Sequence, residues 1–209
     1  MQQGTDVPTS LRTHLIGVVS FQGDFQRHIS MLHGLGVETR EVRNPTDLVG
    51  LHGVVLPGGE STTIGMLMER YGVTEALKAR AAEGLPIFGT CAGLILLAED
   101  ILNSTQPRLG LLPVSVERNA YGRQVESFET RFSSPVFGET ALEGVFIRAP
   151  RIRTCSPEVE LLAALDQEPI LVRHGAILGA TFHPELTQDT RIHRYFVDMV
   201  QTIRAKQLS

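Results

Sequence analysis

The chain has 209 residues, a net charge of −4 and a sequence pI near 6.0, so nucleic acid and anionic membranes are not expected partners. No apolar run approaches the ~18–20 residues that a membrane span requires. Residues 1–13 are polar and lack the apolar core of a signal peptide. We therefore expect a disordered extension over 1–13 and one cytoplasmic domain over 14–205. Cys91 and Cys155, the two cysteines, lie far apart without a C-x-x-C pair, so neither a disulfide nor a metal site is expected.

Short apolar runs alternate with helical patterns over the first hundred residues. The sequence predicts strands at 14–21, 37–42, 51–57 and 85–88, with helices at 24–36, at about 62–82 and from 92 onward. These strand candidates do not alternate between apolar and polar residues. That composition is typical of a parallel sheet whose two faces are both covered by helices.

From about Leu109 the chain changes to short strand candidates separated by Gly, Pro and Asn turns, which predicts an antiparallel extension of the sheet. The segment 189–206 predicts a final helix that begins at an Asp/Thr cap. Its apolar positions share one face: Ile192, Phe196, Met199 and Ile203. The expected fold is therefore a single α/β domain, flavodoxin-like, with a mostly parallel central sheet flanked by helices.

Residues 89–93 read G-T-C-A-G, between a predicted strand and a predicted helix. A tight strand-to-helix turn of this kind presents its central side chain at the carboxyl edge of the sheet, and the flanking glycines avoid collisions there. A helix that begins just after Cys91 favours its thiolate, and the Ala92 amide would face an oxyanion on a bound substrate. The alternative is that Cys91 is a small buried core residue, which is common for free cysteines.

A nucleophile needs a base, and His183 in "FHPE" is the candidate. In an extended backbone His183 and Glu185 face the same side, so Glu185 would orient the imidazole, and Pro184 would keep the segment out of a helix. A surface turn or half of a metal site are the alternatives, although the P-C-x-x-C partner of the zinc deaminases is absent.

The segment "LPGGEST" follows the third predicted strand. Gly58 and Gly59 can adopt positive φ and turn backbone N–H groups inward, which would supply a second oxyanion donor. The alternative is an ordinary strand-to-helix loop capped by Ser61.

Together these three segments resemble the class I glutamine amidotransferases, and more narrowly the family of glutaminase subunits of pyridoxal 5′-phosphate synthase. The resemblance runs from about Leu15 to Arg204. Its narrower motifs are "GGEST", "ERNAYGRQ" and "FIRAP". The departures are the polar extension and Ser20-Phe21 in place of an expected Ala-Leu, and neither lies at a proposed site.

The resemblance implies that Cys91 is the nucleophile of a triad with His183 and Glu185. It also implies an oxyanion hole from Gly58, Gly59 and Ala92. The residues it implies for binding L-glutamine are Gly59, Glu60, Ser61, Arg118, Ile147 and Arg148. An arginine fork suits the α-carboxylate of glutamine, but the sequence does not say which arginine serves.

The implied activity is hydrolysis of glutamine to glutamate and ammonia, without a metal or organic cofactor. The ammonia would pass to a synthase subunit that makes pyridoxal 5′-phosphate from a pentose phosphate and a triose phosphate. The family further implies a glutaminase that is weakly active alone and is activated by docking. Two alternatives stay open: another cysteine hydrolase or class I glutaminase, and a non-catalytic docking subunit that has kept the fold.

Overall fold

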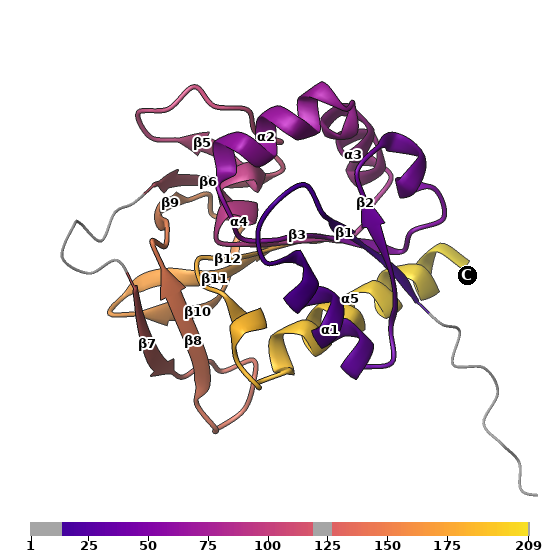
Figure 1. Cartoon of the computed structure of the whole chain (residues 1–209). Helices are drawn as coiled ribbons and strands as arrows, with labels where there is room; N and C mark the ends of the chain where they lie inside the picture. Colours follow the sequence, from indigo (N-terminus) through magenta and orange to yellow (C-terminus); the bar gives the residue numbers. More distant parts are fainter. Residues whose placement is uncertain (1–13, 119–126, 209) are drawn as a thin grey trace, which may run out of the picture.

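The computed structural model describes residues 14–118 and 127–208 (Figure 1). The expected N-terminal extension, and most of the "ERNAYGRQ" segment, lie outside the described residues. In the described ranges, no helix is both long enough and apolar enough to cross a bilayer.

A seven-stranded sheet runs through the centre of the molecule in the order β10-β11-β12-β4-β3-β1-β2 (Figure 1). Five neighbouring strands are parallel: β2 (Glu38–Val42), β1 (Leu15–Val19), β3 (Gly53–Leu56), β4 (Ile87–Thr90) and β12 (Ile177–Ala180). Two antiparallel strands extend the sheet beyond β12: β11 (Glu168–His174) and β10 (Glu160–Leu165). Every residue of β3, β4 and β12 is buried, as the non-alternating sequence predicted for a sheet covered on both sides.

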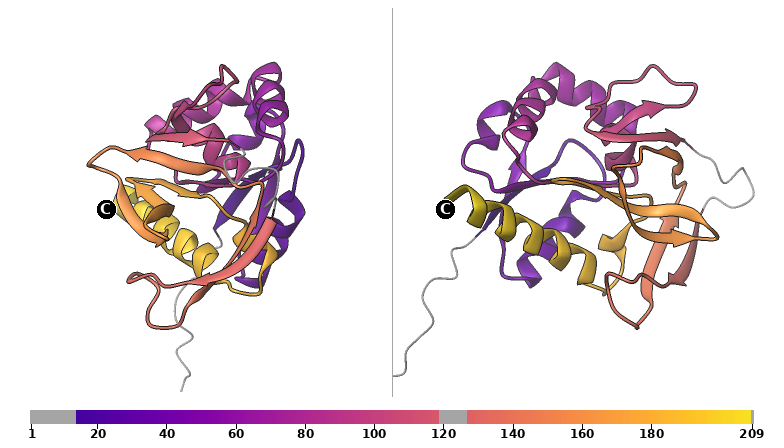
Figure 2. Two further views of the ribbon diagram at one scale, coloured as in Figure 1. Left: turned by 90° about the vertical axis from the view of Figure 1, so that its left-hand side faces the viewer. Right: turned by 180° about the vertical axis from the view of Figure 1, so that it is seen from behind.

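Helices cover both faces of this sheet (Figures 1 and 2). One face carries α2 (Ser61–Arg70), α3 (Val73–Ala82) and α4 (Ala92–Leu97), and the other carries α1 (Phe25–Gly34) and α5 (Arg191–Leu208). Each face has its own buried apolar cluster. The predicted apolar face of the last helix packs into the second cluster through Ile192, Phe196, Met199 and Ile203. The predicted α/β fold is therefore confirmed.

Two small sheets and two short 3₁₀ helices complete the described fold. A three-stranded sheet contains β5 (Ala98–Ile101), β6 (Leu112–Glu117) and β9 (Arg151–Cys155), and an antiparallel ribbon contains β7 (Ser127–Phe132) and β8 (Leu142–Ile147). The 3₁₀ helices are η1 (Pro45–Leu48) and η2 (Pro184–Leu186).

Two predicted helices differ from the structure in extent. The single helix predicted over 62–82 is broken by Gly72, whose φ of 75° lies in the left-handed region. The helix that follows Cys91 ends after six residues, and the chain continues as a strand. Its last carbonyls, Leu96 O and Leu97 O, accept hydrogen bonds from the 109–111 segment at 2.7 and 2.9 Å, which gives the helix end partners outside itself.

The order of the parallel strands determines where chemistry can occur. The loops after β1, β3, β4 and β12 all leave the same edge of the sheet, because these strands are parallel neighbours. In open α/β sheets this carboxyl edge is where ligands bind. All three sequence motifs lie in these loops.

Candidate active site

Cys91 lies at the tip of a tight turn between β4 and α4, with a positive φ of 49° that is rare for a residue with a side chain. Its backbone N–H donates to Ala180 O of β12 at 2.9 Å, which ties the turn to the neighbouring strand. A Cβ atom at Gly93 would lie 2.0 Å from Leu56 O, and one at Gly89 would lie 2.6 Å from the Gly93 carbonyl carbon. The predicted tight turn between strand and helix, called the elbow below, is present. Close backbone contacts explain why both flanking residues are glycine.

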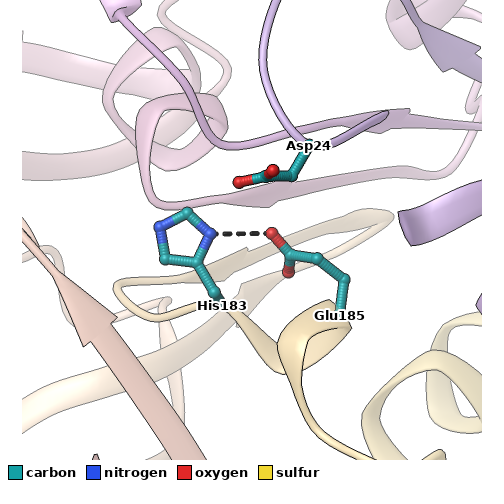
Figure 3. Close-up of side chains that lie close together, drawn as sticks. All are labelled: Asp24, His183 and Glu185. Atoms are coloured by element: carbon teal, nitrogen blue, oxygen red, sulfur yellow. Dashed lines mark hydrogen bonds and ion pairs between the residues drawn. The ribbon is translucent and has the colours of Figure 1, made fainter. Parts of the chain in front are cut away.

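His183 and Glu185 form a hydrogen-bonded pair in which Nδ1 lies 2.7 Å from Oε1 (Figure 3). The prediction of an extended backbone here is wrong, because Pro184 begins the 3₁₀ helix η2 and His183 caps it. Proline is well suited to that first helical position, since it has no N–H to leave unpaired. The His183 N–H donates to Val145 O of β8 at 2.8 Å, so the β7–β8 ribbon helps to hold the histidine.

The charges of this pair are set by burial and by close partners. Burial alone would lower the pKa of His183, but hydrogen bonds with Cys91 and Glu185 outweigh it and raise the pKa to about 10. Burial alone would raise the pKa of Glu185, but His28 and His183 hold it well below its usual range. His183 is therefore a cation and Glu185 an anion near neutral pH. Cys91 is 6% exposed and lies within hydrogen-bonding reach of the His183 ring.

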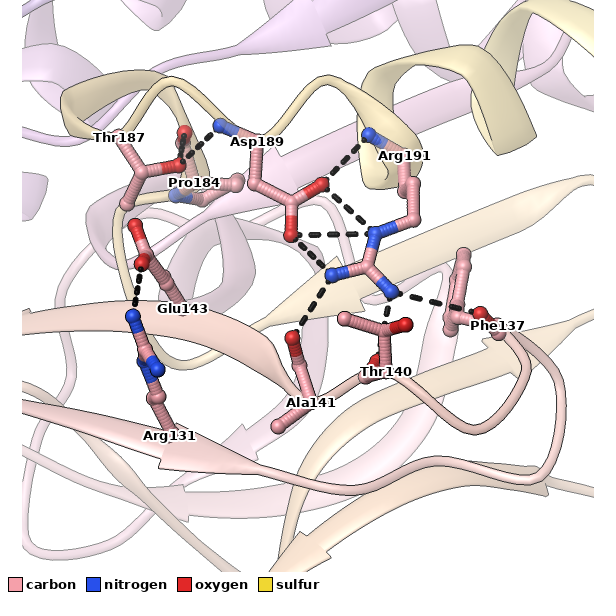
Figure 4. A network of polar contacts seen from close by, with 9 residues as sticks. All are labelled: Arg131, Phe137, Thr140, Ala141, Glu143, Pro184, Thr187, Asp189 and Arg191. Atoms are coloured by element: carbon pink, nitrogen blue, oxygen red, sulfur yellow. Dashed lines mark hydrogen bonds and ion pairs between the residues drawn. The ribbon is translucent and has the colours of Figure 1, made fainter.

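A polar network fixes the turn that carries His183 and Glu185 to the rest of the fold (Figure 4). Thr187 Oγ1 donates to Pro184 O at 3.1 Å and accepts from the Asp189 N–H at 3.1 Å. Asp189 Oδ1 in turn accepts at 3.0 Å from the backbone N–H of Arg191, the first residue of α5. The Arg191 guanidinium then donates to three carbonyls of the β7–β8 loop: Phe137 O at 3.4 Å, Thr140 O at 2.7 Å and Ala141 O at 2.8 Å. The turn that carries Glu185 is thus held between α5 and the ribbon.

The Gly58–Gly59 loop lies beside the histidine. A Cβ atom at Gly58 would lie 2.2 Å from His183 Cε1, so Gly58 is needed for close packing against the ring. Only Gly59 has the expected positive φ, at 149°, whereas Gly58 does not. The next residue, Glu60, caps α2 through its carboxylate, so the alternative cap at Ser61 is wrong.

These loops enclose a cavity of about 250 Å³ at the carboxyl edge of the sheet. Of the residues predicted from the sequence, it is lined by Cys91, His183, Gly59, Glu60, Ser61, Arg118, Ile147 and Arg148. The other predicted residues, Gly58, Ala92 and Glu185, lie behind this lining in the same loops. The sequence did not point to three further lining residues: Gln22, Asp24 and Ile95. Gln22 and Asp24 lie in the loop after β1, at the same carboxyl edge as the loop after β3. Their position after an apolar parallel strand is the sequence signal that predicts them.

A charged cluster forms one side of the cavity. Arg118 donates to Glu60 Oε1 at 3.0 Å and to Thr62 Oγ1 at 2.9 Å, and it also contacts Gln106 Oε1. Burial alone would raise the pKa of Glu60, but hydrogen bonds from Thr63 and Thr62 outweigh it and lower the pKa to about 2. The cavity therefore presents a fixed cation beside a fixed anion, and Arg148 adds an exposed cation at its wall.

Asp24 lies near His183 and Glu185, and possible ligand atoms of these three residues lie within 4.8 Å of one another (Figure 3). Such a set resembles a metal site, but His183 Nδ1 and Glu185 Oε1 already face each other in a hydrogen bond. The arrangement suits proton transfer by the histidine better than it suits a cation.

Both cysteines are free thiols. Cys155 is exposed on β9, and partial burial of its sulfur raises its pKa. Cys91, by contrast, lies 3.8 Å from Ile147 O and within the histidine's reach. Cys91 is thus buried beside a histidine, whereas Cys155 is exposed.

Comparison with known proteins agrees with this geometry. The subunit PdxT of pyridoxal 5′-phosphate synthase from Thermotoga petrophila is 52% identical over 186 residues, covering 89% of this chain and 99% of that protein. PdxT from Thermus thermophilus is 53% identical over 187 residues, covering 88% and 97%.

Solved structures give the same result. A crystal structure of a glutamine amidotransferase has a TM-score of 0.86 at 49% identity, covering 89% of this chain and 98% of that one. A putative GMP synthase protein from Thermoplasma acidophilum, at 23% identity and a TM-score of 0.70, shares the fold over 94% of this chain and 98% of its own. The model of the SNO glutamine amidotransferase family matches residues 18–202. The chain therefore belongs to the SNO glutamine amidotransferase family.

Proposed function

We propose that this protein is the glutaminase subunit of a pyridoxal 5′-phosphate synthase, which hydrolyses L-glutamine to L-glutamate and ammonia. The observation that carries the proposal is the constellation of Cys91, His183 and Glu185 at the carboxyl edge of the sheet, with its nucleophile and base in one cavity. The relatives named PdxT support the assignment of substrate and pathway.

The reaction is an acyl transfer in two halves. The Cys91 thiolate attacks the side-chain amide carbon of glutamine, and the C=O electrons move to oxygen. Backbone N–H groups of Ala92 and of the Gly58–Gly59 loop stabilise this oxyanion. His183 then donates its proton to the leaving nitrogen, which departs as ammonia and leaves a γ-glutamyl thioester on sulfur.

In the second half, neutral His183 takes a proton from water, and the resulting hydroxide attacks the thioester. Collapse of this intermediate releases glutamate and restores the thiolate–imidazolium pair. Glu185 holds the imidazole in one orientation and stabilises its charged form throughout. Each step uses only these side chains and water, so no cofactor enters the proposal.

The charged cluster suits the polar end of glutamine. We assign the α-carboxylate to Arg118 and the α-ammonium to Glu60, because these two groups already lie 3.0 Å apart at the cavity wall. Gly59, Ser61, Ile147 and Arg148 complete the proposed binding site.

The proposal includes a partner. Free ammonia at neutral pH is mostly non-nucleophilic ammonium, so it is best passed directly to a bound synthase subunit. That subunit would join it to a pentose phosphate and a triose phosphate. The proposed location is the cytoplasm, where free thiols such as the two found here are kept reduced.

The test is pyridoxal 5′-phosphate formation by this chain mixed with the synthase subunit. We expect glutamine to support product only when this chain is present, and ammonium to support it without this chain. With amide-¹⁵N glutamine and excess unlabelled ammonium, the product should keep the label. Failure to release glutamate in the mixture would overturn the glutaminase proposal, and glutamate release without product would indicate a different class I glutaminase.

Substitution of Arg118 tests the binding assignment. Arg118→Gln should raise KM for glutamine about 10–100-fold with a smaller change in kcat, because hydrogen bonds to charged groups contribute about 1.5–3 kcal/mol. Steady-state glutamate release measures both constants. The control is Arg131→Gln on the outer ribbon, where the arginine pairs with Glu143. An unchanged KM in the Arg118 variant together with a raised KM in Arg148→Gln would transfer the carboxylate to Arg148.

A further inference from the structure

A second buried histidine lies behind the catalytic pair. His28 of α1 places Nε2 3.4 Å from Glu185 Oε2 and 3.1 Å from Thr90 Oγ1, and Thr90 directly precedes the nucleophile. On its other side, His28 Nδ1 lies 2.9 Å from Nε2 of His193 on α5. His28, Thr90 and His193 are all fully buried. Each oxygen of the Glu185 carboxylate thus faces a different histidine.

The hydrogen-bond geometry selects one placement of protons in this cluster. Glu185 Oε2 is buried and has no hydrogen-bond partner within the described ranges, and the polar atom that faces it is His28 Nε2 at 3.4 Å. A bare ring nitrogen at that distance would set two lone pairs against each other. A proton on His28 Nε2 removes that repulsion, and this N–H points between Thr90 Oγ1 at 3.1 Å and Glu185 Oε2 at 3.4 Å. His28 Nδ1 is then an acceptor, and His193 donates to it from Nε2.

The opposite tautomers of His28 and His193, each protonated on Nδ1, would leave a buried N–H group without an acceptor. If His28 carried its proton on Nδ1, His193 Nε2 would be the acceptor and its proton would sit on Nδ1. His193 Nδ1 is buried and has no hydrogen-bond partner in the described structure. A buried N–H without an acceptor is rarer in proteins than an unpaired acceptor, so a bare Nδ1 is the favoured state there. Burial lowers the pKa of His193 to about 3, so His193 is neutral and carries a single proton.

We propose that His28 is a positioning residue for the glutaminase reaction, holding the second carboxylate oxygen of Glu185 by donation from Nε2 while His193 fixes the required tautomer. This inference rests on the proposed function. His28 does not line the cavity, so it acts on the substrate only through Glu185 and His183. Without His28, the carboxylate is held only through its Oε1 bond to His183, because Oε2 has no hydrogen-bond partner in the described ranges.

The charged and titratable groups around Glu185 come from three elements besides its own turn. They are Asp24 from the β1–α1 loop, His28 from α1 and His193 from α5, together with His183 of the same turn. Among them, His28 is the group that meets Oε2. The position of the carboxylate therefore depends on how α1 and α5 pack against each other beneath the site.

The test compares three variants in the complex with the synthase subunit. His28→Leu removes the donor, whereas His28→Gln can place an amide N–H where Nε2 lies. His33→Gln is the control, since His33 lies on the same helix but is exposed and bonds Thr39. We expect His28→Leu to lower kcat about 10–100-fold with KM changed less than about threefold, from the loss of a hydrogen bond to a charged group. His28→Gln should recover most of kcat, and His33→Gln should match the parent.

The outcomes separate this inference from the proposed function. A parent complex that releases no glutamate overturns the glutaminase itself. An active parent with an equally active His28→Leu, or with His28→Gln as impaired as His28→Leu, overturns the positioning role and leaves the glutaminase intact. A lower melting temperature with unchanged kcat would show that His28 only packs the core.

A spectroscopic measurement on the unsubstituted chain does not depend on any variant folding. Nitrogen-15 NMR of the histidine rings should show His28 protonated on Nε2 and bare on Nδ1. Protonation on Nδ1 alone would overturn the proposal. The proton of the His183–Glu185 hydrogen bond, identified by its loss in Glu185→Gln, should shift in His28→Leu and return toward its parent position in His28→Gln.

Discussion

Replacement of Cys91 by alanine is expected to abolish glutamate release while pyridoxal 5′-phosphate formation from ammonium continues in the complex. The thioester cannot form without sulfur, and removal of a catalytic nucleophile typically costs on the order of 10⁴-fold or more. The side chain is small and buried at the end of β4, so its truncation should leave the fold and the partner contact intact. Glutamate release and product formation, measured on the same samples, check both halves of the expectation.

Cys155→Ala is the matched control, because Cys155 is an exposed free thiol away from the cavity. It should keep full activity with either nitrogen source. Persistent glutamate release by Cys91→Ala would remove Cys91 from the mechanism. Loss of the ammonium-driven reaction as well would show that the substitution disturbs the complex rather than the chemistry.

Gly93→Ala is expected to destabilise the protein by about 3 kcal/mol or more, which places it among the severe single substitutions. Alanine is the better helix former by roughly 0.5–1 kcal/mol, so helix propensity alone predicts the opposite sign. The new Cβ, however, would lie 2.0 Å from Leu56 O, and backbone cannot yield as a flexible side chain can. Denaturant unfolding followed by circular dichroism measures the change.

Gly34→Ala provides the control on another helix. Gly34 is the last residue of α1, and a Cβ there meets nothing within 4 Å. That variant should be neutral, or more stable by up to about 1 kcal/mol. Equal stability of Gly93→Ala and Gly34→Ala would contradict the steric explanation of the elbow.

The motifs were readable from the sequence because each follows a strongly apolar strand. Position at the carboxyl end of a parallel strand was enough to bring Cys91, the Gly58–Gly59 loop and His183 together. The local backbone was harder to predict. Pro184 was expected to keep the catalytic turn extended, yet proline also starts a helical turn readily, and the turn is held by the Asp189–Arg191 network, which involves the distant β7–β8 loop.

The residues that the sequence did not reveal depend on packing between distant segments. His28 looks like one polar residue on an amphipathic helix, and nothing local distinguishes it from His33. Its role comes from burial against α5 and η2, which contribute residues more than 150 positions later. A single sequence carries no signal that His28 contacts Glu185 and His193 in the fold.

The strand order also limits how the geometry of such a site can change during evolution. The Gly58–Gly59 loop, Cys91 and His183, which we propose as oxyanion loop, nucleophile and base, follow β3, β4 and β12, which are successive hydrogen-bonded neighbours. Adjacent strands lie about 4.8 Å apart because of their backbone hydrogen bonds, whatever side chains they carry. The separation of these three segments is therefore a property of the polypeptide backbone itself. Side-chain substitutions can alter the reactivity or the substrate, but the spacing between the three loops stays the same as long as the strand order is kept.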